Sequence, residues 1–224
     1  MTCRHAAVPA VARYVLALAT ALLLGACAHR QPAELPAWSA EDMAQITRFD
    51  IKGKVGFRRG ETGGSAALLW QQENDRYRLT ATGPLGAGSV RIDGTSARVR
   101  IEDGNGSRES GDPEALLAEA IGWPVSINSL SYWVRGLPAP QAEGEAAAEI
   151  VRDAAGRPVR LRQQEWEVVY DRWQADGSRL LPHKVVATGG DSRVTLLIER
   201  WTTPPPVAAH TVRTPATATP AAAP

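Results

Sequence analysis

Cysteine is almost absent from this chain of 224 residues, and so is any imbalance between basic and acidic side chains. The two cysteines, Cys3 and Cys27, lie near the N-terminus, which excludes a disulfide framework or a cysteine-ligated zinc site in the rest of the chain. The 25 Lys and Arg residues are matched by 24 Asp and Glu residues. Because nucleic-acid binding needs a strong positive field, we expect no nucleic acid as a partner.

Motifs of enzyme chemistry are missing as well. The chain contains no Gly-x-Ser-x-Gly, no Walker loop and no Gly-x-Gly-x-x-Gly. Of its four histidines, His183 alone belongs to the part that we expect to fold; the others are His5, His29 and His210. One histidine without a nearby cysteine makes neither a metal cluster nor a Cys–His pair, so we expect no metal, no cofactor and no catalytic residue. A pair of carboxylates, as in a glycosidase, stays open.

Residues 1–26 have the pattern of a secretory signal. Arg4 and Arg13 are followed by an apolar or small run from Tyr14 to Leu24, and Gly25-Ala26 precedes Cys27. The run of 11 residues is too short to cross about 30 Å of hydrocarbon as a permanent span. Leu-Gly-Ala-Cys resembles the bacterial lipobox, whose cysteine is lipidated and becomes the first mature residue. The alternative is ordinary secretory cleavage beside an incidental cysteine.

The composition of two further segments separates them from the body. Residues 27–37 form a polar linker that contains proline, and residues 203–224 hold six Pro, seven Ala and five Thr. The latter segment has too little bulky apolar surface to offset its ordering entropy, which predicts a disordered tail. A proline-rich recognition motif is the weaker interpretation, because arginine and aromatic flanks are lacking.

Apolar and polar residues alternate through most of the body, residues 38–202. This pattern predicts strands near 51–58, 65–72, 76–81, 90–93, 98–102, 150–152, 158–164, 165–172, 181–188 and 193–201. Helices are predicted from Ser39 to about Arg48, after Asp112-Pro113, and over about 128–135. The result is a mainly β fold, a large antiparallel sheet curled into a barrel or half barrel with helices on one side.

Tryptophan is in excess, with seven Trp against two Phe and four Tyr. Most of these rings could simply fill the core. A roomy apolar interior that holds a lipid-like ligand is the other interpretation. A second unusual feature is the loop from Gly83 to Gly88, because it carries Leu85 in its centre. Leu85 either folds back onto the core or is exposed to enter a membrane or lipid.

Several short motifs follow one another along residues 38–201. They are Trp70-Gln71-Gln72, Asp75-Arg76-Tyr77-Arg78-Leu79, Gly83-Pro84-Leu85-Gly86, Asn128-Ser129-Leu130, Trp133-Val134-Arg135-Gly136-Leu137-Pro138, Trp166-Glu167-Val168-Val169-Tyr170, Leu181-Pro182 and a last strand ending at Trp201. With the lipobox that ends at Cys27, this series resembles the LolB family of outer-membrane lipoproteins. The tail has no counterpart in the family pattern.

The resemblance implies an unclosed antiparallel half barrel whose short helices form a lid over an apolar cavity. It implies a monomer, anchored by Cys27 to the periplasmic face of the outer membrane, with Ala28 permitting that sorting. It also implies acceptance of lipoproteins by their acyl chains from a periplasmic carrier, LolA, and their insertion into the membrane, without nucleotide.

The same resemblance suggests the residues that carry this function. Leu85, flanked by Pro84 and Gly86, matches the loop of membrane delivery, and Trp70, Tyr77, Trp133 and Trp166 are candidates for the cavity. Three alternatives stay open: a lipid-anchored protein that binds a small apolar ligand without transfer, the related soluble carrier itself, and a hydrolase that uses His183.

Overall fold

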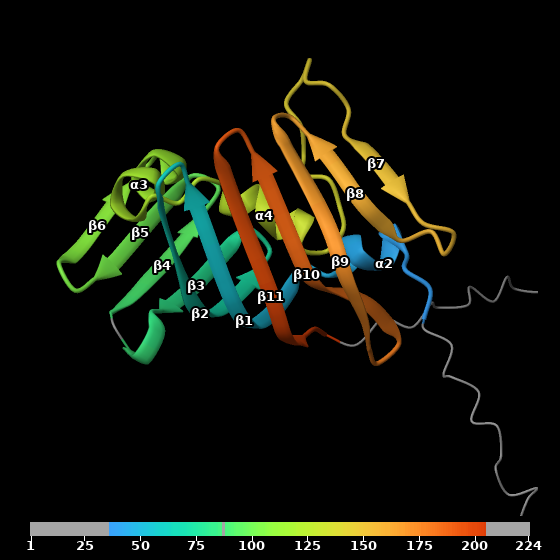
Figure 1. Cartoon of the computed structure of the whole chain (residues 1–224), viewed down its shortest axis with the longest axis horizontal. Helices are drawn as coiled ribbons and strands as arrows, with labels where there is room; N and C mark the ends of the chain where they lie inside the picture. The colour runs from blue at the N-terminus through green and yellow to red at the C-terminus, as the bar shows by residue number, and fades with distance from the viewer. Residues whose placement is uncertain (1–35, 87, 205–224) are drawn as a thin grey trace, which may run out of the picture. The chain divides into compact units, whose positions relative to one another are not determined.

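The computed structural model describes residues 36–86 and 88–204, and these form one antiparallel sheet with short helices (Figure 1). The predicted signal, Cys27, Ala28 and most of the tail lie outside the described residues. The strands are β1 Arg48–Arg59, β2 Thr62–Glu73, β3 Arg76–Thr82, β4 Ser89–Thr95, β5 Arg98–Asp103, β6 Gly106–Ser110, β7 Glu149–Arg152, β8 Pro158–Gln163, β9 Trp166–Asp176, β10 Arg179–Gly189 and β11 Ser192–Thr202. The helices are α2 Ala40–Gln45, the 3-10 turn η1 Pro84–Gly86, α3 Pro113–Ile121 and α4 Ile127–Trp133.

The sheet consists of two meanders that meet in its middle. Its strand order is β6-β5-β4-β3-β2-β1-β11-β10-β9-β8-β7, so the first and last strands of the chain are neighbours. The strands β6 and β7 end the sheet and do not pair with each other. The predicted mainly β, unclosed antiparallel sheet with a few short helices is therefore confirmed.

One face of the sheet carries the core, as the alternating pattern predicts. On β1 the side chains of Phe49, Ile51 and Val55 are buried while Lys52 and Lys54 are exposed. The same alternation continues through β11, where Val194, Leu196 and Ile198 are buried. A single apolar cluster runs through both meanders and includes the inner residues of α3 and α4.

Side-chain caps define where the three α-helices begin. The hydroxyl of Ser39, the carboxylate of Asp112 and the hydroxyl of Ser126 accept hydrogen bonds from backbone N–H groups of α2, α3 and α4. The first helix ends at Gln45, earlier than the predicted Arg48, because the period-two pattern of β1 already begins at Arg48. Among the described residues no helix is long and apolar enough to cross a membrane.

A buried arginine joins two of these helices. Arg135 follows α4 and donates from Nη1 to the carbonyl oxygens of Met43 and Ile46, at 3.2 and 2.7 Å, and from Nε to that of Ser131, at 3.0 Å. Its guanidinium also lies over the ring of Tyr132. Arg135 thus satisfies carbonyls at the end of α2 and fixes that helix against α4.

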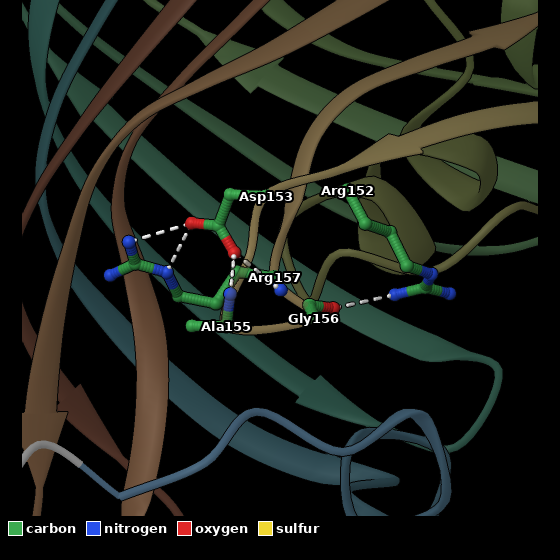
Figure 2. A network of polar contacts seen from close by, with 5 residues as sticks. All are labelled: Arg152, Asp153, Ala155, Gly156 and Arg157. Atoms are coloured by element: carbon green, nitrogen blue, oxygen red, sulfur yellow. Dashed lines mark hydrogen bonds and ion pairs between the residues drawn. The ribbon is translucent and has the colours of Figure 1, made fainter.

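The β7–β8 hairpin at one edge of the sheet is held by a polar network (Figure 2). The Asp153 carboxylate accepts from the backbone N–H groups of Ala155 and Arg157 and from the Arg157 guanidinium. These hydrogen bonds, chiefly that from the Arg157 side chain, lower the pKa of Asp153. Arg152 donates to the carbonyl of Gly156 and stacks over Trp38, so the hairpin also holds the segment that leads into α2.

Candidate functional site

The inner face of the sheet carries an apolar cavity of about 790 Å³. It lies between the inner faces of strands β1 to β5 and the segment that joins α3 to α4. Its volume falls within the range of about 300–1,000 Å³ that is usual for ligand sites. Its apolar lining consists of Val55, Phe57, Ala66, Leu68, Leu79, Ala81, Val90, Ile92, Ile121, Trp123 and Ile127.

The turn between α3 and α4 places an aromatic ring on the cavity wall. Gly122 ends α3 with φ of 67°, a left-handed conformation that favours glycine, and the chain then turns into Trp123. The rings of Trp123 and Phe57 meet edge to face with centroids 5.9 Å apart. This contact joins the turn between α3 and α4 to β1 across the inner face of the sheet.

Polar residues and the Gly83–Gly88 loop complete the lining. The β5–β6 hairpin contributes Glu102, Asp103, Gly104 and Asn105, and the ends of the loop contribute Gly83 and Gly88. The loop that carries Leu85 joins β3 to β4, and both of its ends are therefore part of the cavity wall. An apolar ligand in this cavity would lie next to the base of the loop.

A backbone hydrogen bond and a short 3-10 turn shape the Gly83–Gly88 loop. The N–H of Gly83 donates to the carbonyl of Gly88 at 3.1 Å and closes the loop, and η1 spans Pro84–Gly86. Gly86 and Gly88 have φ of 77° and 78°, and a Cβ on either would meet no atom within 4 Å. Pro84 and Gly86 are exposed. The side chain of Leu85 lies outside the described part of the chain.

Two of the aromatic residues expected in the cavity lie one step beyond its wall. Trp70 and Tyr77 point inward on β2 and β3, next to the lining residues Leu68 and Leu79 in the same inward rows. Trp70 is fully buried and donates from Nε1 to Gln72 Oε1 at 3.0 Å. Burial raises the pKa of Tyr77 to about 12. Neither residue lines the 790 Å³ cavity.

The other two aromatic residues pack in the second half of the sheet. Trp133 on α4 and Trp166 on β9 have ring centroids 6.0 Å apart. Trp133 donates from Nε1 to Gln163 Oε1 at 2.9 Å, and Trp166 covers Gly189. Trp166 borders a smaller cavity of about 430 Å³ that is shared with Trp123. All four candidates thus fill the interior beside the main cavity.

Sequence reasoning missed most of the residues that line the cavity. Phe57 and Trp123 are the aromatic residues of its wall, and most of its other apolar residues are aliphatic side chains on the inward rows of β1 to β4. The alternating pattern places these side chains on the inner face, but it does not tell a filled stretch from a hollow one. That distinction depends on where α3 and α4 cross the sheet.

The described residues lack a cluster suited to a metal ion. They contain no group of three His, Cys, Asp or Glu side chains that could hold a metal. His183 is buried on β10, and its Nδ1 lies 2.8 Å from the carbonyl oxygen of Ile198. Burial lowers the pKa of His183 below its ordinary value. His183 does not line the 790 Å³ cavity.

Comparison with known proteins finds a family whose model is described as "Outer membrane lipoprotein LolB" and matches residues 47–201. The chain is 37% identical over 199 residues to an outer-membrane lipoprotein LolB of Chromohalobacter salexigens, covering 86% of this chain and 91% of that one. It is 36% identical to those of Alkalilimnicola ehrlichii, covering 86% and 98%, and of Pseudomonas aeruginosa, covering 72% and 77%. Among solved structures, a LolA superfamily protein of Nitrosomonas europaea is similar with a TM-score of 0.44 and 10% identity, covering 72% and 90%.

Proposed function

The chain belongs to the LolB family of outer-membrane lipoproteins, and we propose that it accepts lipoproteins from a LolA-like periplasmic carrier and inserts them into the outer membrane. The cargo would be held by its acyl chains. The observation that supports this most is the apolar cavity of about 790 Å³ whose wall includes both ends of the Gly83–Gly88 loop. Cargo binding and membrane delivery would then use adjoining parts of one site.

Transfer of this kind needs contact between apolar surfaces and no covalent chemistry. Each CH₂ group of an acyl chain that enters water costs about 0.8 kcal/mol, so passage from cavity to cavity avoids a large barrier. The wall is mainly aliphatic and aromatic, with Phe57 and Trp123 as its largest side chains, and its polar groups lie mostly at the β5–β6 hairpin. We infer that the protein acts as a monomer and without a cofactor, and that it is not an enzyme.

The parts of the chain outside the described residues complete the proposal. Residues 1–26 would be removed as a signal, Cys27 would carry the acyl anchor, and Ala28 would permit sorting to the outer membrane. Two or more acyl chains on one residue anchor a protein stably. Residues 27–37 would tether the half-barrel domain, residues 38–202, and residues 203–224 would form a tail whose role stays open.

Leu85 would deliver the cargo by entering the membrane from its loop between Pro84 and Gly86. The open space at Gly86 and Gly88 supports this role, because a Cβ on either residue would meet no atom within 4 Å. Trp70 and Tyr77 would be reached by chains that extend past Leu68 and Leu79. Trp133 and Trp166 would be reached if α4 moved away from β9.

A transfer assay with the mature Cys27→Ser chain, carrier-bound lipoprotein and liposomes tests the proposal. Ala66→Phe adds a ring inside the cavity, whereas Ala67→Phe adds the same ring to the outer face of the same strand. We expect Ala66→Phe to reduce uptake at least about tenfold, because filling the cavity displaces acyl contacts, and Ala67→Phe to leave uptake unchanged. Equal uptake by both variants would contradict the cavity as the cargo site.

Leu85→Glu separates the second step from the first. Uptake from the carrier should persist, while insertion into liposomes should be lost, because a carboxylate at the loop tip opposes entry into hydrocarbon. Equal loss of both steps would point to misfolding, which circular dichroism would detect. The competing interpretations predict otherwise: a protein that binds a small apolar ligand would take up no lipoprotein, and a hydrolase would lose activity on His183→Ala.

A further inference from the structure

We propose that the outer face of the sheet, where β1 meets β11, binds an anionic phospholipid surface. Five exposed cations form this seam patch: Lys52, Lys54, Arg58, Arg193 and Arg200. They lie on two neighbouring strands in the middle of the sheet, on the face opposite to the cavity. In Figure 1 these strands face the viewer and α4 lies behind them.

The cations of the seam patch have no acidic partners. Within residues 36–86 and 88–204, no carboxylate oxygen lies within 4.0 Å of any of their side-chain nitrogens, although Asp50 and Glu199 lie on the same two strands. The patch therefore presents net positive charge to solvent. A surface with net positive charge attracts anions over a distance of about 8–10 Å at physiological salt.

The register places like charges opposite each other along the seam, with no acid paired to them within the described residues. Elsewhere in the sheet several arginines stand directly opposite acids and pair with them, as in Arg78–Asp93, Arg100–Glu109 and Arg162–Glu167. Lys184 stands opposite Arg172, but Lys184 also pairs with Asp171. Along the seam, Lys52 stands opposite Arg200 and Arg58 stands opposite Arg193. Like charges that face each other across two strands destabilise a sheet. An arrangement that opposes folding is explained if the charges serve binding.

Two exposed leucines lie within the same surface. Leu69, 52% exposed, is the cross-strand neighbour of Lys52, and Leu197, 36% exposed, is that of Lys54. Lysine stems beside such leucines extend the apolar area while their ammonium groups reach outward. Cations interleaved with leucine are typical of surfaces that rest in the headgroup region of a bilayer.

A membrane fits this surface better than an acidic protein for two reasons. The chain belongs to a family of outer-membrane lipoproteins, so a bilayer is the surface to which the domain stays closest. The patch also interleaves its cations with the exposed leucines Leu69 and Leu197, which suits headgroups that lie above hydrocarbon. With this face on the membrane, α3, α4 and the cavity would remain open to the aqueous side.

Flotation with vesicles tests this inference on the mature chain that starts at residue 27 and carries Cys27→Ser. This chain lacks the acyl anchor but contains the whole sheet and core, which run from Trp38 to Thr202. We expect binding to phosphatidylethanolamine vesicles with about one quarter phosphatidylglycerol, weakening as salt rises from about 50 to about 500 mM. Vesicles of phosphatidylcholine alone should bind little.

Charge reversal locates the binding face. The double variant Lys52→Glu with Arg200→Glu should lower the vesicle partition coefficient roughly 30-fold or more, because each removed cation contributes about 1 kcal/mol of binding free energy. Leu69→Ser should lower the same coefficient about fivefold. The matched control is Arg76→Glu with Arg98→Glu, which makes the same charge change on β3 and β5. Both arginines are exposed, and neither has an ion pair with an acid among the residues that the structure describes. The control should keep most of the binding.

Three outcomes would overturn the inference: no binding by the parent chain, equal loss in the patch and control variants, or unchanged vesicle binding with lost capture of carrier-bound cargo. The last would assign the patch to the carrier instead. Uptake into the cavity, measured on the same samples, is expected to be normal in the patch variant. Failure of uptake in the parent chain would refute the receptor role and leave the vesicle result standing.

Discussion

Gln163 shows how a single residue holds the two layers of the domain together. It is buried on β8, where its Oε1 accepts from Trp133 Nε1 and from the Ala139 N–H, both at 2.9 Å, and its Nε2 donates to the Ala139 carbonyl at 2.7 Å. One amide thus satisfies an indole of α4 and the backbone that follows it. Buried polar groups of this kind are costly when a partner is removed.

Gln163→Leu should lower the free energy of unfolding by about 3 kcal/mol, because it leaves three buried polar groups without partners. Urea denaturation followed by circular dichroism measures this. The same substitution at exposed Gln174 on β9 is the control and should change stability by less than about 0.5 kcal/mol. If both variants unfold at the same urea concentration, the hydrogen bonds of Gln163 contribute nothing measurable.

His183 should make the domain less stable in mild acid. Burial lowers its pKa below the ordinary value of 6.5, an effect that the hydrogen bond to the Ile198 carbonyl opposes; the charges of Arg172 and Asp176 act in opposite directions. As pH falls through 6.5, the unfolded chain binds a proton that the folded chain does not, so folding loses stability until the lowered pKa is passed. One proton sets a limit of about 1.4 kcal/mol per pH unit.

His183→Asn removes this titration while its amide can still donate to the Ile198 carbonyl. Stability curves of both chains between about pH 7 and pH 5 should diverge, with the parent chain falling more steeply. Parallel curves would show that His183 does not contribute to the acid sensitivity.

At the scale of residues, sequence alone could place side chains on the inner or outer face but could not locate the cavity. The period of two puts both Leu68 and Trp70 inward, and both are buried. Leu68 nevertheless borders the cavity, whereas Trp70 is packed and fully buried. Such a difference depends on contacts between residues far apart in the chain.

Among the strands, β1 depends on a glycine at an irregular point of its pairing with β11. The register shifts between Lys52 and Gly53, and a Cβ on Gly53 would overlap the carbonyl oxygen of Leu197 and lie 3.1 Å from Ile198 Cα. These are backbone atoms of the partner strand, which cannot yield by a change of rotamer. The close approach of the two strands therefore requires glycine here.

Gly53→Ala should destabilise the domain by about 3 kcal/mol, because the added methyl forces β1 and β11 apart. Gly56→Ala on the same strand is the matched control, since its Cβ would meet only the Gly64 carbonyl oxygen, at 3.9 Å. We expect the control to be neutral or slightly stabilising. Thermal unfolding distinguishes the two, and equal melting temperatures would contradict the close approach.

The elements themselves were largely predictable, since alternation and helix caps are local signals. The strand β6 was the hardest to foresee, because Gly106–Ser110 has no buried residue and hence no alternating pattern. It is defined by pairing with β5 alone. The first helix was predicted too long because its last turn has no strong stop signal before β1.

Taken as a whole, the molecule has one apolar cluster that crosses the boundary between the two meanders. Neither meander buries its inner face without the helices and the other meander. We therefore expect urea to unfold residues 38–202 in a single transition, with tryptophan fluorescence and circular dichroism giving the same midpoint. Two separate midpoints would show that the meanders are independently stable units.

The central position of the first and last strands has a consequence for biogenesis. A secreted chain enters the periplasm from its N-terminus, and β1 to β6 can pair by short hairpins as they emerge. The edge of β1 that does not pair with β2 stays unpaired until β11 is available. Most of the chain separates these two strands, and pairing over such a distance is slow. Until the last residues have crossed the inner membrane, the receptor exists as an open sheet that periplasmic chaperones would need to shield from aggregation.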